Sequence, residues 1–213
     1  MAQGIRVGMI GAGWPGTKHA EGYRAAGGFQ VAAVADLIPA RRKALLQQCP
    51  GSAEHADALS VINDKSIDAV SVCLPNHLHA PVALAALKAG KHVVCETPPT
   101  LTPGEAKKLA AAASKAGKVL LYAAQRRFGG AEQAAAQALA KGYAGDVVHA
   151  RVSWMRTRGV PAGTGGWFTD KSKAGGGAMM DLGVQMLDVG WAMLGQPRPL
   201  SAFATMPKRR WAA

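Results

Sequence analysis

The feature that most constrains this chain is a set of three closely spaced glycines directly after an apolar segment. Residues 5–10 have the character of a short strand, and Gly11-Ala-Gly13-Trp-Pro-Gly16 follows them at the start of a helical stretch. Such spacing is informative when it lies between a strand and a helix. Gly11 allows the tight turn, Gly13 lets the backbone approach a pyrophosphate, and Gly16 lets the helix pack closely on the strand. The sequence therefore predicts a dinucleotide-binding turn.

A carboxylate in the expected place supports this prediction. Residues 29–35 form a second apolar strand that ends at Asp36, which lies 20 residues beyond Gly16. The helix N-terminus offers N–H donors and a positive dipole end to phosphates, and Asp36 can accept hydrogen bonds from an adenosine ribose. A carboxylate there would repel a 2′-phosphate, which favours NAD, while the nearby Arg41 keeps NADP open. Trp14 lies inside the loop and is a further candidate contact.

Apolar strands alternate with helices over the first part of the chain. This alternation predicts a parallel sheet covered by helices on both faces, in an α/β domain over residues 1–124. Residues 51–66 are ambiguous and fit a short strand followed by a turn of helix. Thr102 and Glu105 have the spacing of a capping box at a helix start. The further predicted strands are 68–74, 92–95 and 119–124, and the further predicted helices begin near residues 39, 79 and 102.

The pattern changes after about residue 125, where a second domain is predicted to begin. This part, residues 125–213, is expected to be an incomplete α+β domain. An alanine-rich helix is predicted first, then a long strand, a glycine-rich loop, an apolar helix and the start of another strand. The predicted segments are 131–141, 146–157, 159–177, 178–194 and the region near Leu200.

Composition excludes several classes of protein. With 49% hydrophobic residues the chain has enough apolar surface to fold, and its three cysteines are too few for a disulfide scaffold and lack metal-ligand spacing. No apolar run reaches the roughly 18 residues that a membrane span needs, and the N-terminus lacks the pattern of a signal peptide. We therefore expect a cytoplasmic protein with no metal site and no membrane partner.

The charge is strongly positive, with 25 basic and 13 acidic side chains and a formal net charge of +12. The basic residues are scattered or form short clusters, and no basic stripe is interleaved with aromatic residues. That pattern is typical of a solvated surface rather than of a nucleic-acid interface, so no nucleic-acid partner is predicted.

Three further segments carry a resemblance to a known family. Residues 70–79 hold Pro-Asn and a later His after a strand, residues 89–98 end in Glu-Thr-Pro, and residues 174–188 hold Gly-Gly-Gly followed by spaced acidic residues. Together with the glycine turn, and in this order from about residue 5 to 200, they resemble the Gfo/Idh/MocA oxidoreductases, the glucose–fructose oxidoreductase and inositol dehydrogenase group.

The resemblance implies an N-terminal Rossmann domain and a C-terminal, mostly antiparallel sheet that binds substrate and mediates homo-oligomers. Typical members oxidise or reduce a hydroxyl or carbonyl of a sugar or cyclitol. The implied cofactor contacts are Leu74, Asn76, His79 and Glu96, the last at the nicotinamide ribose. Helix capping by Asn76 and a structural role for His79 are open alternatives. The resemblance also suggests a cis peptide bond before Pro98.

The chain departs from the family at positions that carry catalysis. Thr97 stands where the family has a lysine, and a hydroxyl can only donate or accept a hydrogen bond. Gln185 stands where the family has its catalytic histidine, and a neutral amide cannot act as a general base. Asp181 is then the best remaining proton acceptor, while Asp188 could simply anchor its helix. Complete members run about half as long again, so the second domain is expected to be partial.

Three functions remain open on this basis. The leading hypothesis is an NAD(P)-dependent oxidoreductase in which Thr97, Asp181 and Gln185 form the reacting site. The alternatives are an NAD-retaining glycosidase of the same family and a non-catalytic dinucleotide-binding member. Arg126, Arg127 and Arg156 could either bind substrate or remain solvated.

Overall fold

The computed structural model describes residues 4–156 and 165–205. A six-stranded sheet forms the first part of the chain, and every strand pair in it is parallel, in the order β3-β2-β1-β4-β5-β6. The order reverses at β1, which is the doubly wound pattern that brings ligands to the carboxyl ends of the central strands. The strands are β1 (Ile5–Ile10), β2 (Phe29–Ala35), β3 (Ala53–His55), β4 (Ala69–Val72), β5 (His92–Cys95) and β6 (Leu120–Tyr122).

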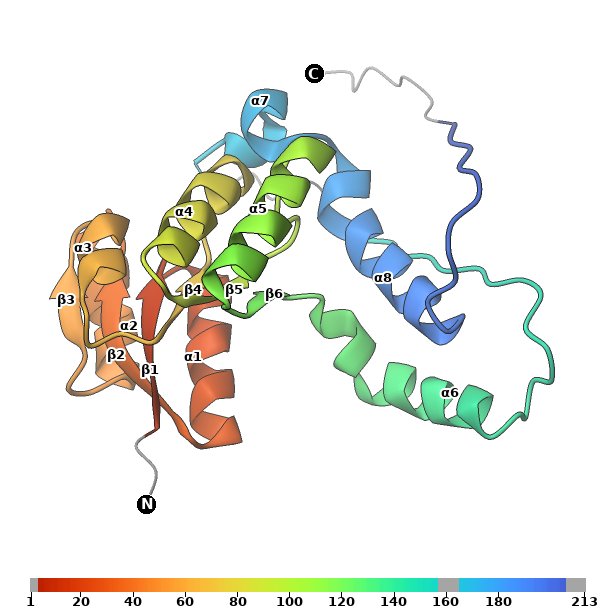
Figure 1. The fold of residues 1–213 in the computed structure, drawn as a ribbon, viewed down its shortest axis with the longest axis horizontal. Helices are drawn as coiled ribbons and strands as arrows, with labels where there is room; N and C mark the ends of the chain where they lie inside the picture. The colour runs from red at the N-terminus through yellow and green to blue at the C-terminus, as the bar shows by residue number, and fades with distance from the viewer. Residues whose placement is uncertain (1–3, 157–164, 206–213) are drawn as a thin grey trace.

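Helices cover both faces of this sheet, as the alternating pattern predicts (Figure 1). The first two helices pack on one face together with side chains of β1 and β2, and the next three pack on the other. They are α1 (Trp14–Ala26), α2 (Pro39–Gln48), α3 (Ala58–Asn63), α4 (Asn76–Lys88) and α5 (Pro103–Ala116). Residues 51–66 thus hold both a short strand and a helix, and α4 begins three residues before the predicted start.

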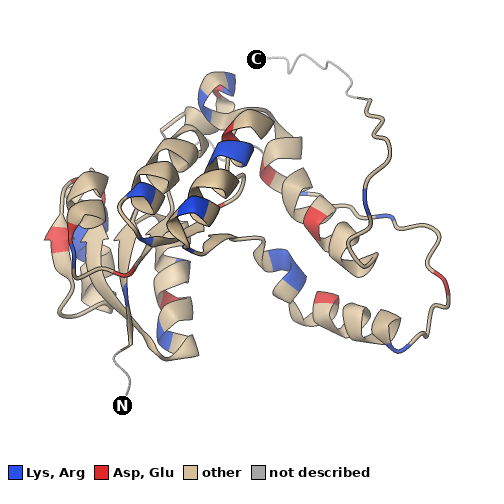
Figure 2. Ribbon diagram, viewed as in Figure 1, with Lys and Arg blue, Asp and Glu red and all other residues tan. Residues whose placement is uncertain are grey.

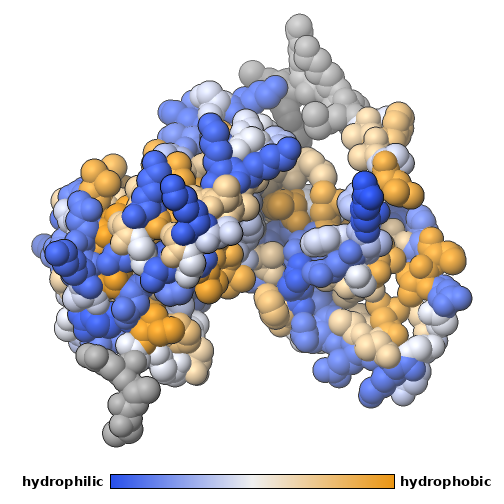
Figure 3. All heavy atoms as spheres, in the orientation of Figure 1, coloured by the Kyte–Doolittle hydropathy of each residue, from blue (hydrophilic) through white to orange (hydrophobic). Residues whose placement is uncertain are grey.

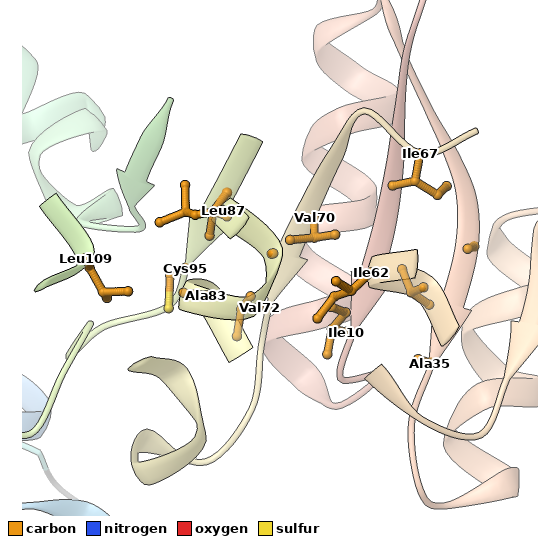
Figure 4. Close-up of a cluster of buried hydrophobic side chains, with 14 of the residues drawn as sticks. Ile10, Ala35, Ile62, Ile67, Val70, Val72, Ala83, Leu87, Cys95 and Leu109 are labelled. Carbon is orange, nitrogen blue, oxygen red and sulfur yellow. The ribbon is translucent and has the colours of Figure 1, made fainter. Parts of the chain in front are cut away.

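The larger core lies between the sheet and helices α3, α4 and α5. Val70 and Val72 of β4 contact the buried faces of these helices, whose Leu87 and Leu109 are also almost fully buried (Figure 4). Each fully buried leucine stabilises the fold by roughly 2 kcal/mol through the apolar area removed from water. A strand that is apolar on both faces needs a helix on each side, which explains why the strands lack polar alternation.

The start of α5 confirms the predicted capping box. The Thr102 side chain accepts a hydrogen bond from the Glu105 backbone N–H at 3.2 Å, and the Glu105 carboxylate accepts one from the Thr102 N–H at 3.1 Å. These bonds satisfy two of the donors that a helix start leaves unpaired. Gly117 ends the helix in the left-handed conformation, with φ of 61°.

All regular elements of the second part of the chain are helical in the described residues (Figure 1). It begins with a 3-10 turn, Gln125–Phe128, and the predicted alanine-rich helix α6 (Gly130–Ala140). After the 3-10 turn Trp167–Thr169 and the short α7 (Lys171–Ala174), a π-helical turn, Met179–Gly183, leads into α8 (Val184–Met193).

The two strands predicted in this part are wrong for the described residues. Residues 146–156 and the region around Leu200 have irregular backbone, while Thr157 and the tail from residue 206 lie outside the described residues. A strand is defined by backbone hydrogen bonds to a neighbouring strand, so alternation in the sequence alone does not produce one. Of the predicted α+β elements of this part, the described residues therefore contain the helices but not the strands.

The surface matches the scattered charge of the sequence. Basic and acidic residues are scattered over the helices of both parts (Figure 2). Apolar side chains are exposed on the second part, among them Val148 and Met155. Figure 3 shows orange areas on the surface of this part. Across residues 4–156 and 165–205, no helix is long and apolar enough to cross a membrane.

We expect Thr102→Ala to lower the free energy of unfolding by about 1 kcal/mol, because it removes the side-chain acceptor at the start of α5. Urea unfolding followed by circular dichroism measures this change. Thr102→Ser keeps a hydroxyl and should remain near the wild-type value. Equal losses in both variants would contradict the capping contribution.

Candidate functional site

The turn between β1 and α1 is built around two positions that exclude a side chain. Gly11 has φ of +99°, and a Cβ there would collide with the Cys73 carbonyl. A Cβ on Gly16 would collide with the Gly11 carbonyl. Helix α1 therefore starts directly against the carboxyl ends of β1 and β4, in agreement with the tight turn expected at Gly11 and the close packing expected at Gly16.

Gly13 differs from these two glycines because the protein itself leaves room beside it. The nearest atom to a Cβ built there is Pro15 Cδ at 3.8 Å, and the φ of −74° is ordinary. Gly13 is the N-cap of α1, and the first helical bond runs from the Thr17 N–H to the Gly13 carbonyl at 3.0 Å. The N–H groups before that bond face the open side, which suits a phosphate. Trp14 is 71% exposed at the same place.

Asp36 closes the turn from the end of β2. One carboxylate oxygen accepts the Ala12 N–H and the other accepts the Ile38 N–H, each at 2.8 Å. A carboxylate has about four acceptor sites, so two remain for ribose hydroxyls. Arg42 donates to the Asp36 backbone carbonyl at 2.7 Å and to Glu54 at 2.8 Å, whereas Arg41 is exposed.

A hydrogen bond joins the two positions that depart from the family pattern. The Gln185 side-chain amide, from α8, donates to the Thr97 hydroxyl at 2.8 Å, just beyond β5. The same nitrogen lies 3.0 Å from Gln125 Oε1 and 3.3 Å from the Ala123 carbonyl. Gln185 is 4% exposed, and its Oε1 is buried without a hydrogen-bond partner in the described part of the chain. Gln125 is a member of this cluster that sequence reasoning missed.

The two acidic residues near Gln185 have different partners. Asp181 lies in the π-helical turn and forms an ion pair of 3.0 Å with Arg156. Asp188 binds Arg127 through both carboxylate oxygens, which raises the pKa of the Arg127 guanidinium. This bidentate pair ties α8 to the turn after β6, so Asp188 anchors its helix. Arg126 stacks over the Trp154 ring at 4.6 Å.

Asn76 and His79 connect segments of the protein to one another. The Asn76 amide donates to the Ala174 carbonyl at 2.9 Å, while Pro75 occupies the N-cap position, so Asn76 is not the helix cap. His79 is buried, with its ring nitrogens 2.7 Å from the Pro98 carbonyl and 2.6 Å from the Leu74 carbonyl. Burial lowers the pKa of the His79 imidazole despite these two contacts. The Thr97–Pro98 peptide bond is cis.

Leu74 lies beside the glycine turn, since its Cδ2 would be 3.3 Å from a Cβ on Gly11. This position places it at the carboxyl end of β4, next to the predicted dinucleotide contact. Among residues 4–156 and 165–205, no group of three or more His, Cys, Asp or Glu side chains has an arrangement that could hold a metal ion.

Glu96 has an unexpected partner in His19, a residue of α1 that sequence reasoning missed. Their side chains approach to 3.1 Å, and His19 Nδ1 lies 2.5 Å from the Ser71 hydroxyl. Burial by itself lowers the pKa of His19, but the neighbouring Cys73 and Glu96 side chains outweigh burial and raise it to about 10. His19 follows Gly16 by three residues, and that spacing on α1 is the signal that could have pointed to it.

Two protein-family models match this chain, and together they cover both of its parts. The oxidoreductase family with an NAD-binding Rossmann fold, Gfo/Idh/MocA, matches residues 5–124, and the Gfo/Idh/MocA C-terminal domain matches residues 133–211. The chain belongs to the Gfo/Idh/MocA family. The family resemblance found in the sequence is thereby confirmed.

Individual relatives within the Gfo/Idh/MocA family are sugar dehydrogenases. D-glucoside 3-dehydrogenase of Escherichia coli is 36% identical over 91% of this chain and 55% of its own length. Levoglucosan dehydrogenase of Pseudarthrobacter phenanthrenivorans is 31% identical over 91% of this chain and 52% of its own length. The chain thus spans about half the length of these curated relatives.

Solved structures of Gfo/Idh/MocA-type proteins share the fold. GenD2 from gentamicin A biosynthesis, in complex with NAD, has a TM-score of 0.80 and 29% identity, covering 92% of this chain and 55% of that one. A levoglucosan dehydrogenase in complex with NADH and levoglucosan has a TM-score of 0.77 and 27% identity, covering 91% of this chain and 55% of that one.

The glycines make a prediction about stability. Gly16→Ala should lower the free energy of unfolding by roughly 2 kcal/mol, because its Cβ would collide with the Gly11 carbonyl. Gly13→Ala should cost less than about 1 kcal/mol, since its Cβ meets open space. Urea unfolding of the two variants measures the difference. A larger loss in Gly13→Ala would contradict the described turn.

The His19 pair predicts a pH dependence of stability. A raised pKa means that the folded state binds a proton more tightly than the unfolded state, whose histidine has a pKa near 6.5. The resulting stabilisation is fully present below pH 6.5 and is lost as the pH rises to about 10. We expect a change on the order of a few kcal/mol across this window.

His19→Gln is the matched variant, because the amide cannot titrate. The difference in unfolding free energy between wild type and His19→Gln should shrink as the pH rises from 6.5 towards 10. Urea unfolding at a series of pH values measures this difference. A constant difference would show that His19 does not gain its proton on folding.

Proposed function

We propose that the chain acts in an NAD-dependent oxidoreductase that uses a hydroxyl or carbonyl of a sugar- or cyclitol-like substrate. One observation carries this proposal. The dinucleotide turn after β1 and the hydrogen-bonded Thr97–Gln185 pair after β5 lie at the same carboxyl edge of one parallel sheet. In open sheets of this kind, that edge is where cofactor and substrate meet.

The dinucleotide phosphates would lie at the start of α1, against Gly11, Gly13, Trp14 and Gly16. Asp36 would bind the adenosine ribose. The nicotinamide end would be flanked by Leu74, Asn76, His79 and Glu96. His79 would act indirectly, because its ring joins the segments that hold Leu74 and Pro98. Two acceptor sites of Asp36 remain after its backbone contacts, and its charge opposes a 2′-phosphate. We therefore propose NAD, with Arg41 as the residue that would assist NADP.

The proposed chemistry divides between the cofactor and the chain. When bound, NAD would accept a hydride from the substrate carbon. Thr97 and Gln185 would hold the reacting hydroxyl, because both are hydrogen-bonding groups that do not titrate. Asp181 would take the proton, since it is the acidic side chain one helical turn before Gln185. Its 3.0 Å contact with Arg156 would hold the carboxylate in place.

The names of the relatives suggest the substrate class. D-glucoside 3-dehydrogenase, levoglucosan dehydrogenase and inositol 2-dehydrogenases all act on polyhydroxylated rings by their names. We propose the same class here, in the cytoplasm and without nucleic acid. Residues 1–124 would form the cofactor domain, and residues 125–213 would contribute to substrate binding and homo-oligomer formation.

A second candidate is a non-catalytic dinucleotide-binding protein. It is favoured by the neutral Thr97–Gln185 pair and by the engagement of Asp181 with Arg156, because no titratable side chain then lies free at this cluster among the described residues. Such a protein would bind NADH tightly and turn over no sugar.

Binding and turnover together test these proposals. NADH and NADPH are titrated into the purified chain while tryptophan fluorescence is followed, since Trp14 lies in the loop. We expect saturable binding, tighter for NADH, and about tenfold weaker binding in Gly13→Ala, whose Cβ would occupy the space beside the phosphates. No binding of either dinucleotide would overturn the cofactor assignment.

Turnover is then measured as NADH formation with a panel containing a D-glucoside, levoglucosan and inositol. With the substrate found, Asp181→Asn should lower kcat by about 100-fold or more, as expected for loss of a general base. Asp57→Asn, which keeps a helix cap on the distant α3, is the matched control. Binding without turnover of any member would support the non-catalytic candidate.

A further inference from the structure

His19 occupies a bridging position between the two halves of the proposed cofactor site. It lies on α1, the helix whose N-terminus forms the glycine turn, and its side chain reaches across the sheet edge to Glu96 beyond β5. The two side chains are only 14% and 15% exposed. An ion pair in such a setting is screened much less than one on the surface.

The Glu96 carboxylate is held from two sides. Oε1 faces His19 Nε2 at 3.1 Å, and Oε2 accepts the Thr97 backbone N–H at 3.0 Å. These contacts restrict a side chain that would otherwise have several rotamers. They leave about two acceptor sites on the carboxylate for hydroxyl groups of a ligand.

The imidazole is itself fixed at its other nitrogen. Nδ1 lies 2.5 Å from the hydroxyl of Ser71, which is fully buried on β4. The Tyr23 hydroxyl donates to the same Ser71 oxygen at 3.4 Å, and the Tyr23 ring meets the imidazole edge to face. The ring orientation is thus set before any ligand arrives, so Nε2 is directed at Glu96.

These contacts form a continuous chain from the phosphate end of the site to its reacting end. Helix α1 carries His19, His19 holds Glu96, and Glu96 holds the backbone of Thr97, whose hydroxyl meets Gln185. A displacement of α1 at one end would therefore be transmitted to Thr97 at the other.

We propose that His19 is a positioning residue that fixes the Glu96 carboxylate for the dinucleotide and couples the glycine-turn helix to Thr97. This role rests on the proposed function, because it needs a dinucleotide at the site. If the His19–Glu96 pair were merely structural, its loss would lower the stability of the protein. It would not change the affinity for the dinucleotide.

A double-mutant cycle on NADH affinity separates these roles. His19→Asn keeps a polar atom facing Ser71 and loses the one that reaches Glu96, whereas His19→Gln keeps an amide at the position of Nε2. We expect His19→Asn and Glu96→Ala each to weaken NADH binding about tenfold. The double variant should be no weaker than Glu96→Ala, because His19 acts through that side chain.

Two further variants complete the test. His19→Gln should bind NADH within about threefold of wild type. Glu21→Gln, on the same helix but in an exposed pair with Lys18, is the control and should match wild type. If His19→Asn does not fold, Ser71→Ala replaces it in the cycle. Ser71→Ala removes the support of Nδ1, so it should weaken NADH binding in wild type but not in Glu96→Ala.

The outcomes distinguish the present proposal from the proposed function. Wild-type protein that binds no NADH would overturn the proposed function and this role together. Wild-type protein that binds NADH, with His19→Asn equally tight or with losses that multiply to about 100-fold in the double variant, would overturn the positioning role alone.

Discussion

The close contact between the start of α1 and the carboxyl ends of β1 and β4 is the constraint on which the site depends. A side chain at Gly11 would collide with the Cys73 carbonyl, and one at Gly16 would collide with the Gly11 carbonyl. Because the helix can approach this closely, its N-terminus points at the edge where Asp36 and Glu96 also lie. The same approach brings His19 within reach of β4 and β5. One steric condition thus organises both the phosphate end and the reacting end.

The proposed reacting end is held together by a hydrogen bond between neutral side chains. Thr97 and Gln185 remain in contact across the two parts of the chain, although neither can carry a charge. The Asn76 amide joins the same two parts through the Ala174 carbonyl, and the Arg127–Asp188 pair ties α8 to the start of the second part. The arrangement joins the two parts through neutral groups, and in the proposed reaction the proton transfer would fall to Asp181.

Prediction from the sequence succeeded where the deciding interactions are local. The glycine spacing, Asp36 at the end of β2 and the Thr102–Glu105 capping box each depend on residues close together in the chain, and each has its expected geometry. It failed for the strand over residues 146–156, because alternation does not show whether a neighbouring strand is present. The sequence likewise contained no sign that the His79 ring contacts the Pro98 and Leu74 carbonyls.

The sequence by itself determined the fold class, the dinucleotide turn and the family, because periodicity, glycine sterics and motif spacing are properties of short segments. Only the tertiary structure decided which side chains meet at the site. Gln185 and Thr97 are 88 residues apart, and His19 and Glu96 are 77 residues apart. Contacts over such separations depend on how the sheet, α1 and α8 pack. The order of residues along the chain does not encode that packing in any local pattern.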